Sequence, residues 1–363
     1  MIPVRARWLE VPIEPGWLKL LLLPLLPIGW TYGAIAGLHR LLYRKGWRRA
    51  NRVPCRVVSI GSLVAGGAGK TPVAAWLAAA LHRRGHKVVL ASRGYGRLGR
   101  NAVVVVSDGR LIRSRWEECG DEPLVLAAHA VGVPVLVGAN RSLVGWRALS
   151  TFGADVLVLD DGFQHHALER DVDVVLFDGG LGFGSGFTLP RGPLRERPSA
   201  LRAADVIGVI DGPLAPSQQA RLEALAPDTF CFHAQRRPVS LRPLAGGPGE
   251  PLQRLEGAEV GMLSGVAQPR NLRRTLEALG ARVVAERSFR DHHHYRIADL
   301  VGLDAQAPLW ITTEKDAVKI PRSWVRDADV RVLGIELYIE DGGALLDQVE
   351  ARLRAAPRRY PRR

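Results

Sequence analysis

Residues 57–71 read VVSIGSLVAGGAGKT, an apolar run that leads into a glycine-rich stretch ending in Lys70 and Thr71. The following residues, 72–84, have the apolar spacing of a helix, and a proline is tolerated in the first helical turn because N–H groups there lack helical partners. A strand, a glycine-rich loop and a helix in this order are the context of a Walker A motif. The sequence therefore predicts a P-loop nucleotide site.

The residue types of this loop suit phosphate. Glycines allow successive backbone N–H groups to face phosphate oxygens, and the following helix presents its positive end to the same anion. We expect Lys70 to reach the β- and γ-phosphates and the Thr71 hydroxyl to ligate Mg²⁺. The general motif has glycine where this chain has Val64. The residues expected to bind nucleotide are Gly66, Gly67, Ala68, Gly69, Lys70 and Thr71.

Around this loop, short apolar runs alternate with helical patterns. Expected helices include residues 72–84, 122–130 and 140–152, and the expected strands are residues 56–60, 87–91, 102–106, 133–137, 156–159, 172–177, 206–209, 283–285, 309–312 and 330–334. Continuous apolar strands separated by helices are typical of an α/β fold with a mostly parallel sheet. We therefore expect a P-loop NTPase-like sheet with helices on both faces, plus a smaller second α/β domain.

Composition divides the chain further. Residues 1–50 form an apolar and basic segment expected to associate with a membrane through a helix, and residues 51–235 form the P-loop domain. Residues 236–258 include a Pro/Gly-rich stretch and are expected to be a linker. A smaller α/β domain at residues 259–350 and a basic tail at residues 351–363 complete the predicted organisation.

The N-terminal apolar stretch, residues 16–37, is about long enough to cross a bilayer. Lys19 lies inside it, and Pro24 and Pro27 interrupt helical hydrogen bonding. Three interpretations compete: a transmembrane anchor, a buried core helix and a helix lying in the membrane interface. Tryptophans, tyrosines and arginines frame the stretch, which favours the interfacial helix.

The net charge and the cysteine content restrict the binding partners and the cysteine-based sites that the sequence predicts. The 363 residues carry a net charge of +14, which favours an anionic partner. A GC-rich genome, whose proteins are biased toward arginine, explains such an excess equally well. Because no aromatic RNA motif or zinc-finger spacing is present, nucleic acid is not expected as a partner. Cys55, Cys119 and Cys231 are scattered, which is typical neither of a disulfide framework nor of a zinc site.

A second candidate motif, VLVLDDGFQHH, occupies residues 156–166. An apolar strand that ends in acids is the Walker B pattern, so Asp160 and Asp161 are candidate Mg²⁺ ligands, although Asp-Asp-Gly also suits a simple turn. Four weaker clusters, each more typical of a turn or a helix cap when taken alone, are SRGYGR at 92–97, GDEP at 120–123, LPRGPLRE at 189–196 and DHHH at 291–294.

These clusters occur in a specific order together with SGVAQPRN at 264–271 and TTEKDAVK at 312–319. The ordered set resembles the tetraacyldisaccharide 4'-kinases, which phosphorylate the lipid A precursor in Gram-negative bacteria. The resemblance implies transfer of the γ-phosphate of ATP, with Mg²⁺, to the 4'-hydroxyl of an acylated glucosamine disaccharide 1-phosphate. It also implies a monotopic protein on the cytoplasmic face of the bacterial inner membrane, with a P-loop domain and a smaller domain flanking a cleft.

The same resemblance implies roles for single residues. Asp121 of GDEP is the expected base, supported by His292, and Lys70 is the third catalytic residue. Arg195 is expected to lie near phosphate. The family usually has Asn where this chain has Ser62, to which no role is assigned. The expected metal and catalytic network comprises Thr71, Asp160, Asp161, Gln164 and Glu196.

An alternative function is a membrane-associated P-loop GTPase or ATPase switch that transfers no phosphate to a lipid. A nucleic-acid-dependent ATPase would also suit the basic charge. A base outside the P-loop and an apolar anchor favour the kinase. The sequence predicts no oligomeric state.

Overall fold

The computed structural model describes residues 15–325 and 328–356 of the chain. Its strands are β1 Arg56–Gly61, β2 Val88–Ser92, β3 Val104–Asp108, β4 Pro134–Val137, β5 Val156–Asp160, β6 Val172–Asp178, β7 Val206–Ile210, β8 Phe230–Pro243, β9 Glu259–Ser264, β10 Arg282–Ser288, β11 Leu309–Thr313 and β12 Val330–Ile339. Its α-helices are α1 Gly16–Leu21, α2 Leu26–Arg44, α3 Lys70–Arg83, α4 Trp116–Cys119, α5 Asp121–His129, α6 Arg141–Phe152, α7 Pro216–Leu225, α8 Pro269–Ala278, α9 Glu314–Ala317 and α10 Gly342–Ala355.

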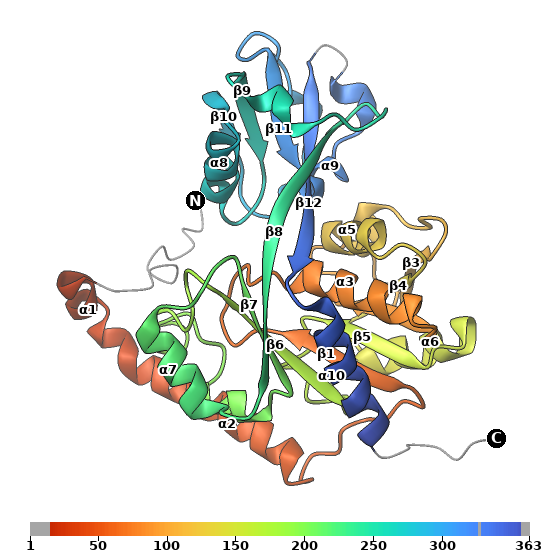
Figure 1. The fold of residues 1–363 in the computed structure, drawn as a ribbon, viewed down its shortest axis with the longest axis vertical. Coiled ribbons are helices and arrows are strands. Elements are labelled where there is room, and N and C mark those ends of the chain that lie inside the picture. Colours follow the sequence, from red (N-terminus) through yellow and green to blue (C-terminus); the bar gives the residue numbers. More distant parts are fainter. Residues whose placement is uncertain (1–14, 326–327, 357–363) are drawn as a thin grey trace.

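All the named strands belong to one sheet (Figure 1), whose order is β10-β9-β11-β12-β8-β7-β6-β1-β5-β2-β4-β3. Neighbouring strands are parallel except in the pairs β12–β8 and β3–β4, which are antiparallel. The predicted α/β fold with a mostly parallel sheet is confirmed. Because the carboxyl ends of parallel strands share one edge, the loops after β1 and β5 meet there.

Successive side chains of β1 are buried on opposite faces of the sheet. Val58 packs with α3 and α5 in one apolar cluster, whereas Val57 packs with α6 in another. Side chains of a strand alternate between faces, so a continuous apolar run needs helices on both sides. The P-loop after β1 is therefore held by a strand that is buried on both faces.

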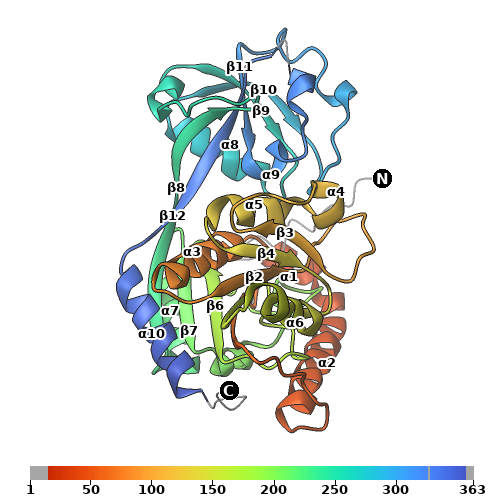
Figure 2. The same cartoon turned by 90° about the vertical axis from the view of Figure 1, so that its right-hand side faces the viewer.

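Two long strands join the two halves of the molecule. We call the part around β1–β7 the P-loop half and the part around β9–β11 the smaller half. β8 and β12 pair antiparallel and run from one half to the other (Figures 1 and 2). The sheet is thus continuous through both halves.

The expected linker at residues 236–258 is wrong over residues 236–243, because these belong to β8. Pro238, which cannot donate a backbone hydrogen bond, lies beside a register shift between Gly334 and Ile335 of β12. This register shift accommodates Pro238 in the pairing of β8 with β12. Leu252–Leu255 then forms a 3₁₀ turn before β9.

The N-terminal segment forms α1, a short 3₁₀ turn and α2, which runs along the outside of the P-loop half (Figures 1 and 2). Among the described helices, none combines the length and the hydropathy needed to span a membrane.

Candidate active site

The glycine-rich loop connects β1 to α3. Gly69 caps α3 with a φ of +71°, a left-handed conformation that glycine adopts without strain. A side chain placed on Gly66 or Gly67 would point into open space, and Ala68 is buried in the core beneath. The loop therefore offers its backbone to a ligand.

The start of the loop explains the missing glycine. Val64 pairs with Leu194 in an isolated bridge and is buried in an apolar cluster with it. In addition, the Arg195 backbone N–H donates to the Leu63 carbonyl at 2.7 Å. Valine thus suits this position because an isolated bridge joins the loop to the LPRGPLRE segment, which places Arg195 beside the P-loop.

Asp160 lies at the carboxyl end of β5, level with Ile60 of β1. The Thr71 hydroxyl donates to its Oδ2 at 3.4 Å, whereas among the described residues its buried Oδ1 has no hydrogen-bond partner. Burial, with the charges of Glu122 and Asp161, raises the pKa of the Asp160 carboxyl to about 7. A buried carboxylate oxygen without a partner, next to the P-loop threonine, fits a divalent cation.

Asp161 follows in a left-handed conformation, with a φ of +52°. Arg195 Nη1 donates to its two oxygens at 2.8 and 3.1 Å, and Lys70 Nζ lies 3.8 Å from Oδ1. Burial alone would raise the pKa of the Asp161 carboxyl, but the charges of Lys70 and Arg195 lower it. Gln164 accepts from Arg195 at 3.4 Å and donates to the Ser62 carbonyl at 3.1 Å.

Glu196, which was predicted to serve the metal and catalytic network, makes an ion pair with α2. Arg40 of α2 donates to both of its carboxylate oxygens, at 2.6 and 3.0 Å, and the Arg40 guanidinium lies 4.5 Å from the centre of the Phe163 ring. The structure thus brings together Thr71, Asp160, Asp161, Gln164 and Arg195, and pairs Glu196 with α2 instead. Within the described ranges, no group of three or more His, Cys, Asp and Glu side chains converges on a metal position.

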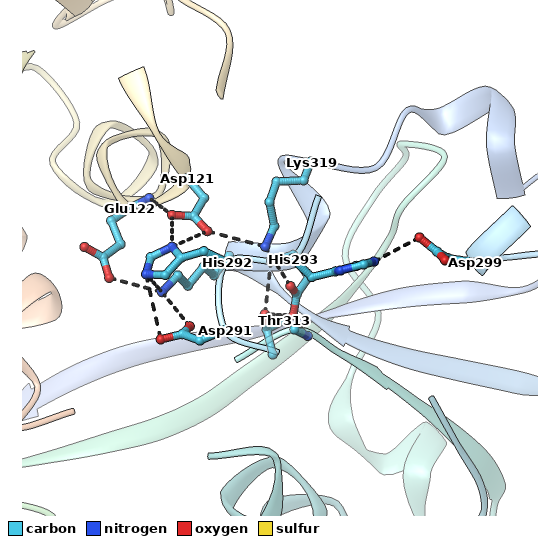
Figure 3. A network of polar contacts seen from close by, with 11 residues as sticks. Asp121, Glu122, Asp291, His292, His293, Asp299, Thr313 and Lys319 are labelled. Carbon is cyan, nitrogen blue, oxygen red and sulfur yellow. Dashed lines mark hydrogen bonds and ion pairs between the residues drawn. The ribbon is translucent and has the colours of Figure 1, made fainter. Parts of the chain in front are cut away.

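The two halves of the molecule meet at Asp121 and His292. Asp121 begins α5 on the P-loop side, whereas His292 lies in the loop after β10, with a φ of +58°. His292 Nδ1 lies 3.0 and 3.1 Å from the two carboxylate oxygens (Figure 3). Because a carboxylate can only accept, Nδ1 carries the hydrogen and Nε2 is left for other partners.

Gly120 makes this approach possible. A Cβ at Gly120, whose φ is +92°, would lie 2.6 Å from the Tyr95 carbonyl oxygen. The Tyr95 ring in turn lies 5.1 Å from the His292 ring. The SRGYGR loop therefore packs directly against the Asp121–His292 pair.

Two lysines that the sequence analysis left without a role complete the network. Lys315 Nζ lies 3.1 Å from Glu122, 3.3 Å from Asp291 and 3.4 Å from His292 Nε2. Lys319 Nζ lies 3.4 Å from Asp121 Oδ2 (Figure 3). The signal for both was TTEKDAVK, but nothing in that motif indicates contact with Asp121.

These cations determine the charge state of Asp121. Burial alone would raise the pKa of its carboxyl, but the hydrogen bond from His292 and the charges of Lys315, His292 and Lys319 lower it to about 2. Asp121 is therefore ionised at neutral pH although only 4% of it is exposed.

Arg141 is a further residue that sequence reasoning missed. It is buried at the start of α6, and its guanidinium donates to the Gly138 carbonyl and, at 3.4 Å, to the Asp160 carbonyl. Burial lowers the pKa of this guanidinium to about 10. A lone arginine in an ordinary helical pattern gives no sequence signal, since its partners are backbone oxygens at the ends of other elements.

Known proteins resemble this chain over most of its length. Residues 21–354 match the family model described as tetraacyldisaccharide-1-P 4'-kinase. The tetraacyldisaccharide 4'-kinase of Syntrophus aciditrophicus (strain SB) is 39% identical over 338 residues, covering 87% of this chain and 90% of the relative. That of Anaeromyxobacter dehalogenans (strain 2CP-C) is 42% identical over 335 residues, covering 89% and 88%.

A solved structure is similar over nearly the whole chain. The crystal structure of LpxK from Aquifex aeolicus in complex with ATP superposes with a TM-score of 0.75 at 28% identity, covering 92% of this chain and 99% of that one.

Proposed function

This chain belongs to the tetraacyldisaccharide-1-P 4'-kinase family, and from that premise we propose how its residues perform the reaction. The chain is an ATP-dependent kinase of lipid A biosynthesis that phosphorylates a tetraacyldisaccharide. We propose that the acceptor is the 4'-hydroxyl of a glucosamine disaccharide 1-phosphate. The observation that carries the residue assignment is the Asp121–His292 pair, and the charge of Glu122, next to Asp121 in the chain, is one of the causes that raise the pKa of Asp160.

The P-loop half holds the donor. The open backbone of Gly66 and Gly67 receives phosphate oxygens, and Lys70 neutralises the β- and γ-phosphates. Thr71 and Asp160 would hold Mg²⁺, since Asp160 keeps one buried oxygen free of hydrogen bonds among the described residues. Mg²⁺ bound there supplies positive charge to the transferring phosphoryl group. Arg195 orients Asp161, and we propose that it also contacts the transferring phosphoryl group.

The acceptor is activated at the boundary between the halves. Asp121 accepts the proton of the sugar hydroxyl as the O–P bond forms, and His292 orients the carboxylate through its Nδ1–H. Lys315, held between Glu122 and Asp291, brings a further positive charge next to His292 Nε2. General base catalysis requires that Asp121 be ionised, and its lowered pKa meets that requirement.

The direct test follows transfer of the labelled γ-phosphate of ATP to a tetraacyldisaccharide 1-phosphate. We expect a phosphorylated disaccharide, and ATP turnover that depends on the added lipid. A nucleotide switch would instead hydrolyse ATP or GTP without the lipid and leave it unlabelled.

Asp160→Asn tests the Mg²⁺ assignment. It keeps the side-chain volume but removes the charge, so the Mg²⁺ concentration needed for half-maximal rate should rise about 10- to 100-fold. Titration of the rate with Mg²⁺ at saturating ATP measures this change, with Asp108→Asn, in an exposed surface ion pair, as the matched control. An unchanged Mg²⁺ requirement in a folded Asp160 variant would remove this residue from the metal site.

We propose that α1 and α2 seat the protein on the cytoplasmic face of the bacterial inner membrane. In α2 a narrow stripe, Gly29, Gly33 and Arg40, faces the protein: glycines approach Thr188, and Arg40 pairs with Glu196. Many other positions from Trp17 to Trp47 expose large apolar side chains. They are Trp17, Leu20, Leu21, Leu23, Ile28, Trp30, Tyr32, Ile35, Leu38, Leu41 and Trp47.

An exposed apolar surface of this kind is more stable in contact with an apolar medium than with water. A contiguous apolar patch on a soluble protein marks an interaction site, and tryptophans beside Arg44, Lys45 and Arg48 match the lipid headgroup region. An acceptor whose acyl chains lie in a bilayer requires an enzyme at that surface.

We expect the protein to sediment with liposomes and to stay bound at high salt, because apolar contact survives screening. Replacing Leu21, Ile28 and Ile35 by Glu, all more than half exposed, should release it and raise the KM for lipid while ATP binding persists. Leu22, which is 4% exposed, is unsuitable because it packs against the protein. A wild-type protein that remains in the supernatant with liposomes would exclude this proposal.

A further inference from the structure

Lys319 lies at the centre of a buried network that joins the two halves (Figure 3). Its side chain is 1% exposed, and Nζ lies 3.0 Å from Asp316 Oδ1 and 3.4 Å from Asp121 Oδ2. Lysine is rarely buried, because an ammonium removed from water is stable only among groups that compensate its charge. The two carboxylates provide that compensation, and one of them belongs to the proposed catalytic pair.

Asp316 fixes where this ammonium lies. Asp316 is completely buried, and its Oδ2 accepts from the Gly265 N–H at 3.0 Å and from the Thr313 hydroxyl at 2.8 Å. Gly265 follows β9, and Thr313 ends β11, so Asp316 is tied to the ends of two neighbouring strands. Its other oxygen holds Lys319, whose position is therefore set by the sheet of the smaller half.

Lys319 in turn contacts Asp121 from the side opposite the α5 backbone contact. The Glu122 N–H donates to Asp121 Oδ1 at 2.9 Å, whereas Lys319 approaches Oδ2 and His292 Nδ1 spans both oxygens. We propose that Lys319 is a positioning residue for phosphoryl transfer, which acts through Asp121 by holding its carboxylate against His292 and balancing its charge. This inference rests on the proposed role of Asp121 and His292 as the proton-accepting pair.

A charge effect distinguishes this role from simple packing. The charged and titratable groups around the Asp121–His292 pair come from several elements. They are Tyr95 from the loop after β2, Cys119 and Glu122 from α4 and α5, Asp291 from the loop after β10, and Lys315, Asp316 and Lys319 from α9 and the turn after it. Loss of the Lys319 charge removes one of the causes that lower the pKa of Asp121, while burial still raises it. Asp121 would then become protonated, and lose activity, at a higher pH than in the wild type.

The experiment compares Lys319→Met, which keeps the length without the charge, with Lys319→Arg, which keeps the charge. Both are assayed as the full chain with ATP and the tetraacyldisaccharide 1-phosphate across the pH range. For Lys319→Met we expect kcat to fall about 10²-fold at neutral pH, with the KM for ATP nearly unchanged. The acidic limb of its pH–rate profile, measured at saturating Mg²⁺ so that Asp160 stays ionised, should move upward by about 1 to 3 pH units. Lys319→Arg should restore the wild-type limb.

Two further variants make the outcome decisive. Lys319→Met combined with Asp316→Asn removes both charges, so it replaces the single variant if that does not fold. A shift in the same direction but smaller is expected, because loss of the Asp316 carboxylate partly offsets loss of the ammonium. Lys87→Met, at an exposed lysine, is the matched control and should match the wild type. If Asp121→Asn is inactive while folded Lys319→Met keeps the wild-type kcat and pH profile, the inference about Lys319 is overturned and the proposed function stands. If Asp121→Asn itself retains activity, the proposed base falls, and the inference falls with it.

Discussion

Replacement of Lys70 by alanine is expected to lower kcat/KM by at least about 10²- to 10³-fold, the range seen when one preorganised charge-stabilising donor is removed. Lys70 Nζ lies 3.0 Å from the Gly66 carbonyl and 3.8 Å from Asp161, so the ammonium is already held over the loop that receives phosphate. Phosphoryl transfer depends mainly on positioning and on neutralising charge. Arg195, which is held by Asp161, supplies a separate positive charge and does not occupy the position of the lost ammonium.

The fold should survive this change. The nearest partners of Lys70 Nζ are a loop carbonyl and Asp161, which keeps Arg195, so no apolar contact of the core is lost. Circular dichroism and thermal unfolding of Lys70→Ala should match those of Lys87→Ala, in which an exposed lysine is removed. A folded Lys70 variant with nearly normal turnover would remove the P-loop assignment.

Local patterns predicted most of the P-loop half. The strand, loop and helix around Gly69 depend on residues close in sequence, so spacing alone located them. The same reasoning failed at β8, where Pro238 and nearby glycines are typical of a linker. Whether such a segment forms a strand depends on pairing with β12, about a hundred residues later, and that pairing leaves no local signal.

The site residues likewise divide into those that local sequence predicts and those that depend on contacts distant in the chain. Thr71 and Asp160 could be paired from sequence, because a Walker A and a Walker B strand lie side by side in this fold class and their register follows. Asp121 and His292 are 171 residues apart and could be joined only through the family resemblance. The pairing of Glu196 with Arg40 and the contact of Lys319 with Asp121 could not be predicted, since both depend on tertiary packing, whereas Asp316 lies only three residues before Lys319.

Asp121→Asn and His292→Asn are expected to lower kcat by about 10²- to 10⁴-fold each, the usual contribution of general base catalysis. Asparagine suits both positions. At Asp121 it preserves volume inside a site that is 4% exposed, and at His292 it tolerates the left-handed backbone that alanine would strain. The KM for ATP should change little, because, among the described residues, the hydrogen bonds and ion pairs of these two side chains involve no residue of the P-loop.

The double variant tests whether the two residues act as one unit. If His292 serves only to orient Asp121, its replacement should not lower kcat further in a variant that already lacks the Asp121 carboxylate. The double variant should then be no more than slightly worse than the worse single variant. Residues that contributed independently would give multiplied losses instead. Single-turnover rates with saturating ATP and lipid measure the chemical step apart from product release. Fully multiplicative losses in folded variants would show that Asp121 and His292 work separately, and would assign His292 a contact of its own with the substrates.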